Sequence, residues 1–145
     1  MSNFDVAVAF TLHEEEKTDT GVVTTDSGGV TRWGIAQKYH PEVDVASLSR
    51  DDAIAIYKIK YWREAWESLP VGLALCVFDC SVNQGPGTAQ MILDSCHHDL
   101  KTFLAMRIRH YSTLSNWDTY GLGWTTRVLT CLQAAISLVG EGVRR

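Results

Sequence analysis

The sequence predicts a mainly α-helical, single-domain fold with a small β-hairpin or loop after the first helix. Apolar residues recur three and four positions apart along most of the chain, which is the period of an amphipathic helix. Residues 17–32 break this period and are rich in glycine, threonine and valine. The 145 residues contain no linker and no low-complexity segment, and they are the size of one domain. We therefore expect a helical body with a cleft where the loop folds back on it.

The N-terminal part of the chain is predicted to be a helix followed by a glycine-rich segment. Residues 3–15 have the helical period, and Glu15 continues their apolar face. Residues 17–32 combine glycine with β-branched residues, which favours a loop that contains a short hairpin. A short helix is expected next over residues 35–39, stopped before Pro41.

The remainder of the chain is predicted to be helical. Ser49 and Asp52 have the spacing of a capping box, so a longer helix should begin after Ser49 and run to about Trp66. Residues 73–82 are almost wholly apolar, which predicts a buried central helix that ends at residues 83–87. The last expected elements are helices over residues 88–96 and 100–114, a Gly/Trp turn at 121–124 and a final helix over 125–139.

The composition argues against several classes of protein. A formal net charge of -4 does not fit a nucleic-acid-binding protein, which usually carries a clustered basic surface. No uninterrupted apolar run approaches the roughly 18 residues that span a bilayer, so no stable membrane insertion is expected. The N-terminus lacks the basic segment and cleavage site of a signal peptide, so we expect synthesis and folding in the cytoplasm.

The cysteines are predicted to be reduced core residues, because cytoplasmic proteins keep their thiols reduced. The four positions are Cys76, Cys80, Cys96 and Cys131. Cys96 beside His97 and His98 is the only weak metal-ligand pattern, and its spacing does not match known zinc sites. We therefore expect no metal and no cofactor.

Glu15 is a candidate general acid. Cleavage of a glycosidic bond needs a carboxylic acid that stays protonated near neutral pH, so that it can protonate the departing sugar oxygen. Glu15 lies on the apolar face, in the last helical turn, and between Glu14 and Glu16. The apolar surroundings, the helix dipole and the neighbouring negative charges all raise the pKa of its carboxyl group. Alternatively, residues 14–16 form a solvated, frayed helix end, as charge runs usually do.

Asp26 and Thr31 are candidate partners of this acid. Gly28 and Gly29 between them allow tight backbone geometry, which can bring a carboxylate and a hydroxyl back over the helix end. Asp26 could hold a water or stabilise positive charge that develops on the sugar, and Thr31 could orient that water. Alternatively, this is an ordinary loop in which Asp26 caps a turn and Thr31 caps a helix.

The aromatic residues favour a carbohydrate cleft, because sugar rings pack their apolar faces on aromatic side chains. Most of the aromatic residues are expected in the core. Trp33 is assigned to the groove, and Trp62 or Trp124 are further candidates.

Polar residues on the predicted central helix are candidates for substrate binding. Asp79 and Asn83 lie one turn apart, and Gln84 follows at the helix end. They could contact N-acetyl groups of the substrate. They could equally satisfy backbone groups at a buried helix end, because buried polar groups need partners in either case.

Five segments, in chain order, together resemble the glycoside hydrolase family 108 muramidases, which are lysozyme-like N-acetylmuramidases found largely as phage and prophage endolysins. The likeness spans nearly the whole chain. The segments are His13-Glu14-Glu15, the Asp-Ser-Gly-Gly-Val-Thr-Arg-Trp-Gly-Ile stretch at 26–35, Ala55-Ile56-Tyr57 with Tyr61-Trp62, the Phe-Asp-Cys-Ser-Val-Asn-Gln-Gly stretch at 78–85, and Gly123-Trp124-Thr125-Thr126-Arg127.

The resemblance implies hydrolysis of the β-1,4 bond between N-acetylmuramic acid and N-acetylglucosamine in peptidoglycan, with one glutamate as the acid. The family's glutamate usually stands in a His-Glu-Gly-Gly motif, and this chain departs from it by having Glu-Glu-Glu-Lys where the glycines belong. Matching the His-Glu pair selects Glu14, whereas an ungapped match from Phe4 selects Glu15, which we prefer because it continues the apolar face. Asp26 and Thr31 carry over from the family's Asp-Pro-Gly-Gly-x-Thr turn, in which Ser27 replaces the proline.

The resemblance further implies one catalytic domain over residues 1–145, without a separate wall-binding module. Such an endolysin would accumulate in the host cytoplasm as a monomer and reach the periplasm and cell wall after a holin opens the inner membrane, with peptidoglycan glycan strands as its partner. One alternative is a lytic transglycosylase, which cuts the same bond with one glutamate and leaves an anhydro sugar. The other is a non-catalytic peptidoglycan-binding or phage structural domain, supported only by the altered glutamate motif.

Overall fold

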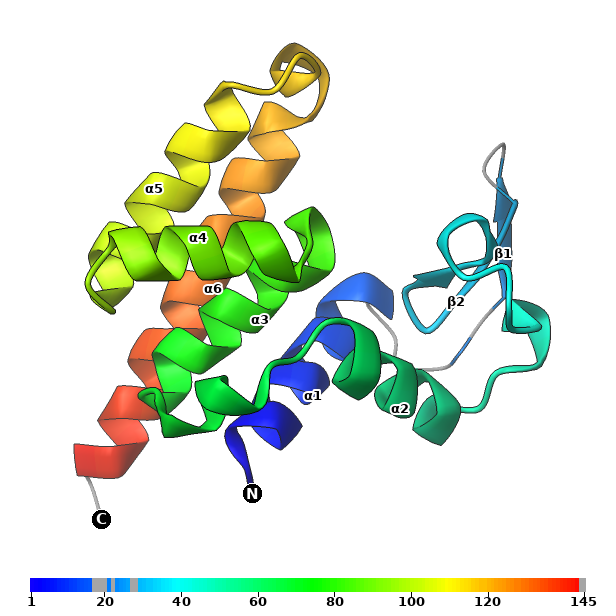
Figure 1. The fold of residues 1–145 in the computed structure, drawn as a ribbon, viewed down its shortest axis with the longest axis horizontal. Helices are drawn as coiled ribbons and strands as arrows, with labels where there is room; N and C mark the ends of the chain where they lie inside the picture. Colours follow the sequence, from blue (N-terminus) through cyan, green and yellow to red (C-terminus); the bar gives the residue numbers. More distant parts are fainter. Residues whose placement is uncertain (17–20, 22, 27–28, 144–145) are drawn as a thin grey trace.

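The protein is mainly α-helical, with a small antiparallel sheet after the first helix, as predicted (Figure 1). In the computed structural model the described residues are 1–16, 21, 23–26 and 29–143, and for Glu16, Asp26 and residues 141–143 the description covers the backbone alone. Helices form one body of the molecule, and the sheet lies to the side of this body, next to α2 (Figure 1).

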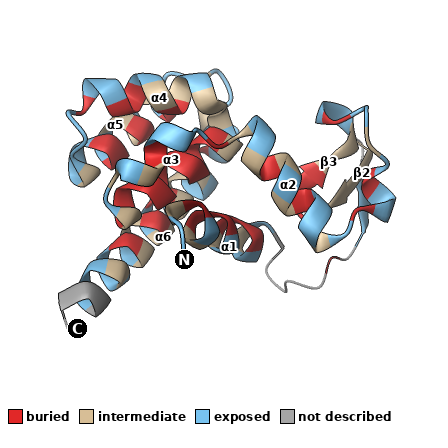
Figure 2. Cartoon of the chain, turned by 60° about the horizontal axis from the view of Figure 1, so that its bottom comes forward, coloured by how far each residue is buried: buried red, intermediate tan, exposed pale blue. Residues whose placement is uncertain are grey.

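The helical body is built around α3 (Val71–Gln84), which is the predicted central helix. Every residue from 72 to 81 is buried, and Figure 2 shows α3 as the most continuously buried helix. Four other α-helices pack against it, and one of them also packs on α6. These elements are α1 (Asn3–Glu16), α4 (Pro86–Ser95), α6 (Trp117–Val143) and, on α6, α5 (Leu100–Ser112).

The sheet has the strand order β1-β2-β3, and both pairs of neighbours are antiparallel. Its strands are β1 (Thr24–Asp26), β2 (Gly29–Arg32) and β3 (Ile35–Ala36). Thr31 pairs with Thr24 on one side and with Ala36 on the other. The predicted hairpin is therefore present. The 3-10 helices Gln37–Tyr39 (η1) and Val45–Ser47 (η2) connect the sheet to α2.

Helix α2 (Arg50–Lys60) begins as predicted and ends earlier than predicted. The Ser49 hydroxyl accepts from the Asp52 backbone N–H at 3.0 Å, and the Asp52 carboxylate accepts from the Ser49 N–H at 3.1 Å, so the capping box is confirmed. The extension to Trp66 was wrong, because the chain leaves the helix after residue 60 and continues as a 3-10 helix, Glu64–Ser68 (η3). This change of path buries the rings of Trp62 and Trp66 against the core.

Two further predictions of local structure were wrong. Residues 35–39 do not form one helix, because their first two residues pair with β2 and only 37–39 are helical. Residues 121–124 do not form a turn, because α6 continues through both glycines. Gly121 is buried, and a Cβ there would lie 2.7 Å from the Trp117 ring. This glycine gives the ring room against the helix, a packing role that leaves the helix intact.

Helix α6 is long and apolar enough to cross a membrane by length and composition alone, a test that core helices of soluble proteins also pass. Polar residues, Arg127 among them, interrupt the helix, so it is not the uninterrupted apolar run of about 18 residues that the sequence analysis found absent. The most apolar 18-residue window within Trp117–Gly140 reaches a mean hydropathy of 1.2. Only 17% of this stretch is buried, and Leu122, Leu129 and Ile136 are exposed.

The four cysteines are buried and free, as predicted for reduced core residues. Cys96 lies beside Leu93 at the end of α4, whereas the other cysteines are on α3 and α6. The Cys131 thiol lies 3.3 Å from a carboxylate oxygen of Asp79, inside the cluster of charges that is described below.

Candidate active site

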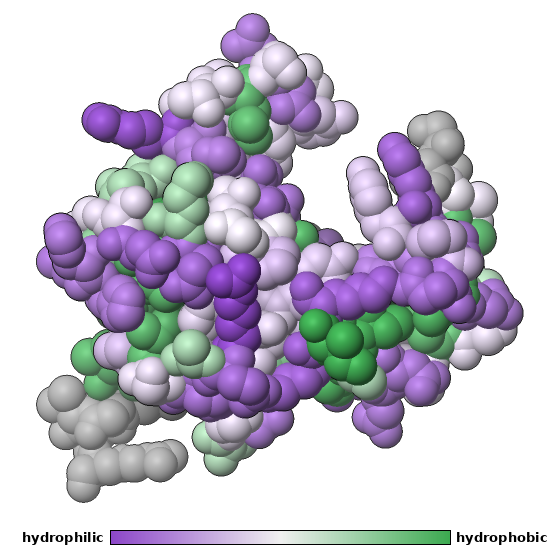
Figure 3. All heavy atoms as spheres, viewed as in Figure 1, coloured by the Kyte–Doolittle hydropathy of each residue, from purple (hydrophilic) through white to green (hydrophobic). Residues whose placement is uncertain are grey.

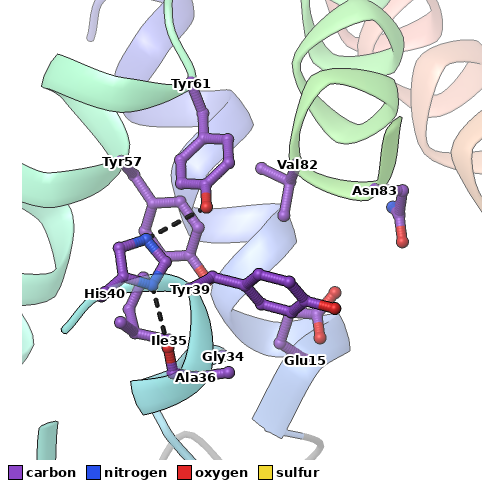
Figure 4. A pocket seen from close by; sticks show the side chains of 10 residues that line it. All are labelled: Glu15, Gly34, Ile35, Ala36, Tyr39, His40, Tyr57, Tyr61, Val82 and Asn83. Carbon is purple, nitrogen blue, oxygen red and sulfur yellow. Dashed lines mark hydrogen bonds between the residues drawn. The ribbon is translucent and has the colours of Figure 1, made fainter. Parts of the chain in front are cut away.

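A hollow of about 210 Å³ lies at the C-terminal end of α1, where the helical body meets the sheet. Its walls come from the end of α1, the turn between β2 and β3, η1, α2 and α3 (Figure 4). Figure 3 shows the molecular surface indented between the helical body and the sheet. Glu15 is the one acidic residue that lines this hollow among the described residues.

The turn after β2 holds the wall of the hollow against Glu15. Trp33 and Gly34 both have positive φ values, 55° and 74°, so the chain turns sharply there. The Tyr57 hydroxyl donates to the Trp33 carbonyl at 2.9 Å and fixes the turn to α2. A Cβ on Gly34 would lie 2.5 Å from that hydroxyl and 2.9 Å from the Glu15 Cβ. Only glycine therefore lets the turn pack this closely on the stem of Glu15.

The surroundings of Glu15 raise the pKa of its carboxyl group, which is the direction that a general acid requires. Its side chain keeps 28% of its accessible surface, and its Oε1 lies 3.1 Å from Arg127 Nη2. Burial raises the pKa of the Glu15 carboxyl, and this effect outweighs the nearby Arg127 charge, which lowers it. The negative charges of Asp79 and Glu14 raise it further. A glutamate with a raised pKa can stay protonated at a pH where exposed glutamates are ionised, and can donate its proton.

A cluster of buried charges lies behind Glu15. Asp79 on α3 is wholly buried, and its two oxygens are divided between Arg127 of α6 and Arg107 of α5. Arg127 reaches Oδ1 with Nη2 at 2.7 Å and Nε at 2.9 Å, while Arg107 Nη2 reaches Oδ2 at 2.8 Å. Burial by itself would raise the pKa of Asp79, but the two guanidinium charges outweigh it and hold that pKa below its ordinary value.

The structure brings Asn83 into the hollow and leaves Asp79, Trp33 and Gln84 outside it. Asn83 donates to the Asp79 carbonyl at 2.8 Å, which directs its amide nitrogen toward the helix (Figure 4). Asp79 has no exposed surface and serves the buried cluster. The Trp33 ring is buried, and its Nε1 donates to the Leu48 carbonyl at 3.1 Å. These two side chains therefore do not form a substrate-binding surface in this structure.

The other predicted partners of the acid are not brought to the hollow within the described part of the chain. Thr31 is in β2 and is half-buried, and it does not line the hollow. The Asp26 backbone pairs with Gly29 at the tip of the hairpin, and its side chain lies outside the described residues. Glu14 borders a separate hollow of about 270 Å³, together with Arg127 and neighbouring residues of α6.

Several residues of the site were missed by the sequence analysis. Tyr39, His40 and Tyr61 line the hollow. The buried His40 ring contacts the Ala36 carbonyl through Nδ1 at 3.0 Å and the Tyr61 hydroxyl through Nε2 at 3.1 Å (Figure 4). Because a carbonyl can only accept, Nδ1 carries a proton. A local signal existed only for Tyr61, which belongs to a segment of the family resemblance.

Arg107 and Arg127 were also missed as site residues. Arg107 shares a helix face with the buried Phe103, Leu104 and Tyr111, and an arginine on an apolar face signals a buried partner. The Tyr111 hydroxyl accepts from Arg107 Nε at 2.8 Å. Within the described residues, no group of three or more histidine, cysteine, aspartate and glutamate side chains could hold a metal ion.

Comparisons with known proteins agree with this picture. The glycosyl hydrolase 108 family matches residues 8–85, which is more than half of the chain. The structure of Brucella abortus SagA is similar with a TM-score of 0.76 and 22% sequence identity, over 93% of this chain and 94% of that chain. This likeness extends the shared lysozyme-like fold beyond the matched family segment. No curated protein matches the sequence.

The matched segment ends at Gly85 and contains Glu15, Gly34, the residues of η1 and α2 that line the hollow, and Asn83. The hollow and Glu15 therefore lie within the segment that matches the family, whereas Arg107 and Arg127 lie beyond it. The chain belongs to the glycosyl hydrolase 108 family and is a peptidoglycan-degrading glycosidase.

Proposed function

We propose that this protein is an N-acetylmuramidase that hydrolyses the β-1,4 bond between N-acetylmuramic acid and N-acetylglucosamine, with Glu15 as the general acid. The observation that carries this proposal is the raised pKa of a glutamate that lines the hollow at the end of α1. Protonation of the bridging oxygen by such a group is the step that glycosidic cleavage needs.

Glu15 is a better candidate for the acid than Glu14 because the two side chains border different hollows. Glu15 faces Tyr39, Tyr61 and Asn83, which offer an aromatic ring, a hydroxyl and an amide to a sugar (Figure 4). Glu14 borders the hollow beside α6. Tyr39 is 69% exposed, so its ring is accessible for packing against the apolar face of a sugar.

We further propose that the enzyme is an endolysin that acts as a monomer on peptidoglycan glycan strands. Its place of synthesis would be the host cytoplasm, and a holin would have to open the inner membrane before it meets its substrate. Family membership supports the enzymatic part of this proposal. A direct check is expression in a bacterial host with and without a co-expressed holin, where only the combination should lyse the cells.

A lytic transglycosylase is the second candidate, and one observation favours it. Glu15 is the only carboxylate among the described residues that line the hollow. A transglycosylase needs one acid and releases an anhydro sugar, whereas hydrolysis adds a water that a second group usually handles. Asp26 is our candidate for that second group in the hydrolase.

The test is digestion of purified peptidoglycan with the wild type and with the Glu15→Gln and Glu14→Gln variants, with released fragments identified by mass and by reducing ends. Reducing muramic-acid ends that disappear only in Glu15→Gln support the muramidase with Glu15 as its acid. If these ends disappear only in Glu14→Gln, Glu14 is the general acid instead. Anhydro ends would establish the transglycosylase, and no fragments from the folded wild type would refute both.

A further inference from the structure

The Glu15 carboxyl group is held from behind by an arginine that is already engaged elsewhere. Arg127 Nη2 lies 3.1 Å from Glu15 Oε1 and 2.7 Å from Asp79 Oδ1, so one nitrogen contacts both carboxyl groups. Arg127 Nε adds a second contact to Asp79 at 2.9 Å. Asp79 is itself held by Arg107 at 2.8 Å and is wholly enclosed. The contact with Asp79 is therefore the stronger of the two that Arg127 makes.

Several other charged or titratable groups surround Glu15. Among the described side chains, the charged groups that act on its carboxyl are Glu14 of α1, Asp79 of α3 and Arg127 of α6. The titratable groups from the other walls of the hollow are Tyr39 and His40 of η1 and its flank, Tyr57 of α2 and Tyr61 at its end. Tyrosine hydroxyls are neutral at the pH where a glycosidase works. Of these groups, Arg127 contacts the Glu15 carboxyl directly, and Asp79 contacts Arg127.

We propose that Asp79 and Arg127 are positioning residues for the acid, with opposite effects: Arg127 holds the Glu15 carboxyl group in place, and Asp79 neutralises Arg127 so that Glu15 keeps its proton. This inference rests on the proposed role of Glu15. Neither residue needs to touch substrate. Arg127 orients one oxygen of the acid, and Asp79 acts only through Arg127, since it is enclosed in the core.

The arrangement follows from the balance of charges. With Glu15 protonated, Asp79 carries one negative charge between two arginines, and the cluster has one excess positive charge. Removing the negative charge of Asp79 leaves Arg127 unneutralised 3.1 Å from Glu15, which favours the ionised acid. Removing Arg127 has the opposite effect, because Glu15 then faces Asp79 without the intervening positive charge. If Asp79 and Arg127 had purely structural roles, removing them would not shift the titration of Glu15 in opposite directions.

The experiment is a pH–rate profile of peptidoglycan digestion for the wild type and three variants, after circular dichroism has confirmed that each is folded. The alkaline limb, where the acid loses its proton, should move to lower pH in Asp79→Asn and to higher pH in Arg127→Met. In Arg127→Lys the charge remains but the two-way contact is lost, so kcat should fall with a smaller displacement of the limb. Arg109→Met removes an exposed arginine of α5 and should leave the profile unchanged.

A second measurement does not depend on activity. The protein is labelled with glutamate carrying ¹³C in its side-chain carboxyl, the Glu15 resonance is assigned by comparison with Glu15→Gln, and its titration is followed by NMR in each variant. The midpoint should move down in Asp79→Asn and up in Arg127→Met. If Asp79→Asn does not fold, the comparison of Arg127→Met with Arg127→Lys carries the test, with a larger upward movement expected in Arg127→Met.

The two measurements separate failure of this inference from failure of the proposed function. Midpoints that move in the same direction, or do not move, in Asp79→Asn and Arg127→Met would overturn the inference even if Glu15→Gln is inactive. Opposite movements with a fully active Glu15→Gln would leave the electrostatic coupling standing and refute both Glu15 as the acid and the catalytic role assigned to its two partners.

Discussion

The buried pair of Asp79 and Arg107 makes a sharp prediction for stability. The Asp79 side chain has no exposed surface and that of Arg107 has 1%, so neither charge can be hydrated after its partner is removed. Loss of one partner from such a pair costs about 3–5 kcal/mol of the free energy of unfolding. We expect the loss for Asp79→Leu at the upper end of this range, because the substitution leaves two arginines without their carboxylate. We expect the loss for Arg107→Met at the lower end of this range, because Arg127 still pairs with Asp79.

The double variant Asp79→Leu/Arg107→Met distinguishes a buried ion pair from generic damage to the core. Replacing both members of a buried pair by apolar side chains is often close to neutral, so the double variant should cost less than the sum of the single variants. Arg127 then loses Asp79 as well, but it is 17% exposed and keeps its contact with Glu15, so part of its charge stays hydrated.

Urea denaturation at neutral pH measures these free energies. A loss of about 4 kcal/mol corresponds to a fall in Tm of roughly 10–15 °C for a domain of this size. Arg109→Met, an exposed control on the same helix, should stay within about 0.5 kcal/mol of the wild type. Additive costs in the double variant, or a cost below about 1 kcal/mol for Arg107→Met, would refute the assignment of a buried, coupled pair.

Further variants probe other parts of the structure. Gly34→Ala should lower the free energy of unfolding by about 1–3 kcal/mol and remove most of the activity, because the φ of Gly34 is 74° and the added methyl would lie 2.5 Å from the Tyr57 hydroxyl. Thermal melts measure the loss of stability, and digestion assays measure the loss of activity. An unchanged Tm would contradict the close packing. Ser49→Ala removes the cap of α2 and should cost about 1 kcal/mol in urea denaturation, with activity retained. Glu15 has a raised pKa in the folded state, so its ionisation opposes folding. The wild type should therefore lose stability relative to Glu15→Gln as pH rises from the ordinary glutamate value of about 4.3 through the raised pKa, and a constant difference across that range would show that the burial effect is absent.

The sequence by itself determined those features that depend on neighbours a few residues apart. The helical period of residues 3–16, the capping box of Ser49 and Asp52 and the apolar run of α3 each appear in the structure where the pattern predicts them. Glu15 was selected as the candidate acid from its neighbours along α1, whereas the pKa of its carboxyl is raised chiefly by burial in the folded protein. For the two helices and the capping box, the determining contacts lie within one or two helical turns, so propensity and periodicity are sufficient to predict them.

Only the tertiary structure decided how distant residues act on that acid. Glu15 and Arg127 are 112 positions apart in the chain, and Asp79 and Arg127 are 48 apart, so no local pattern connects them. Gly121, whose place in the sequence suggested a turn, lies inside a continuous helix, where the absence of a side chain leaves room for the Trp117 ring one turn earlier. Burial of Asp79 decided its role as well, because a carboxylate without access to water must be paired within the protein and cannot meet a substrate.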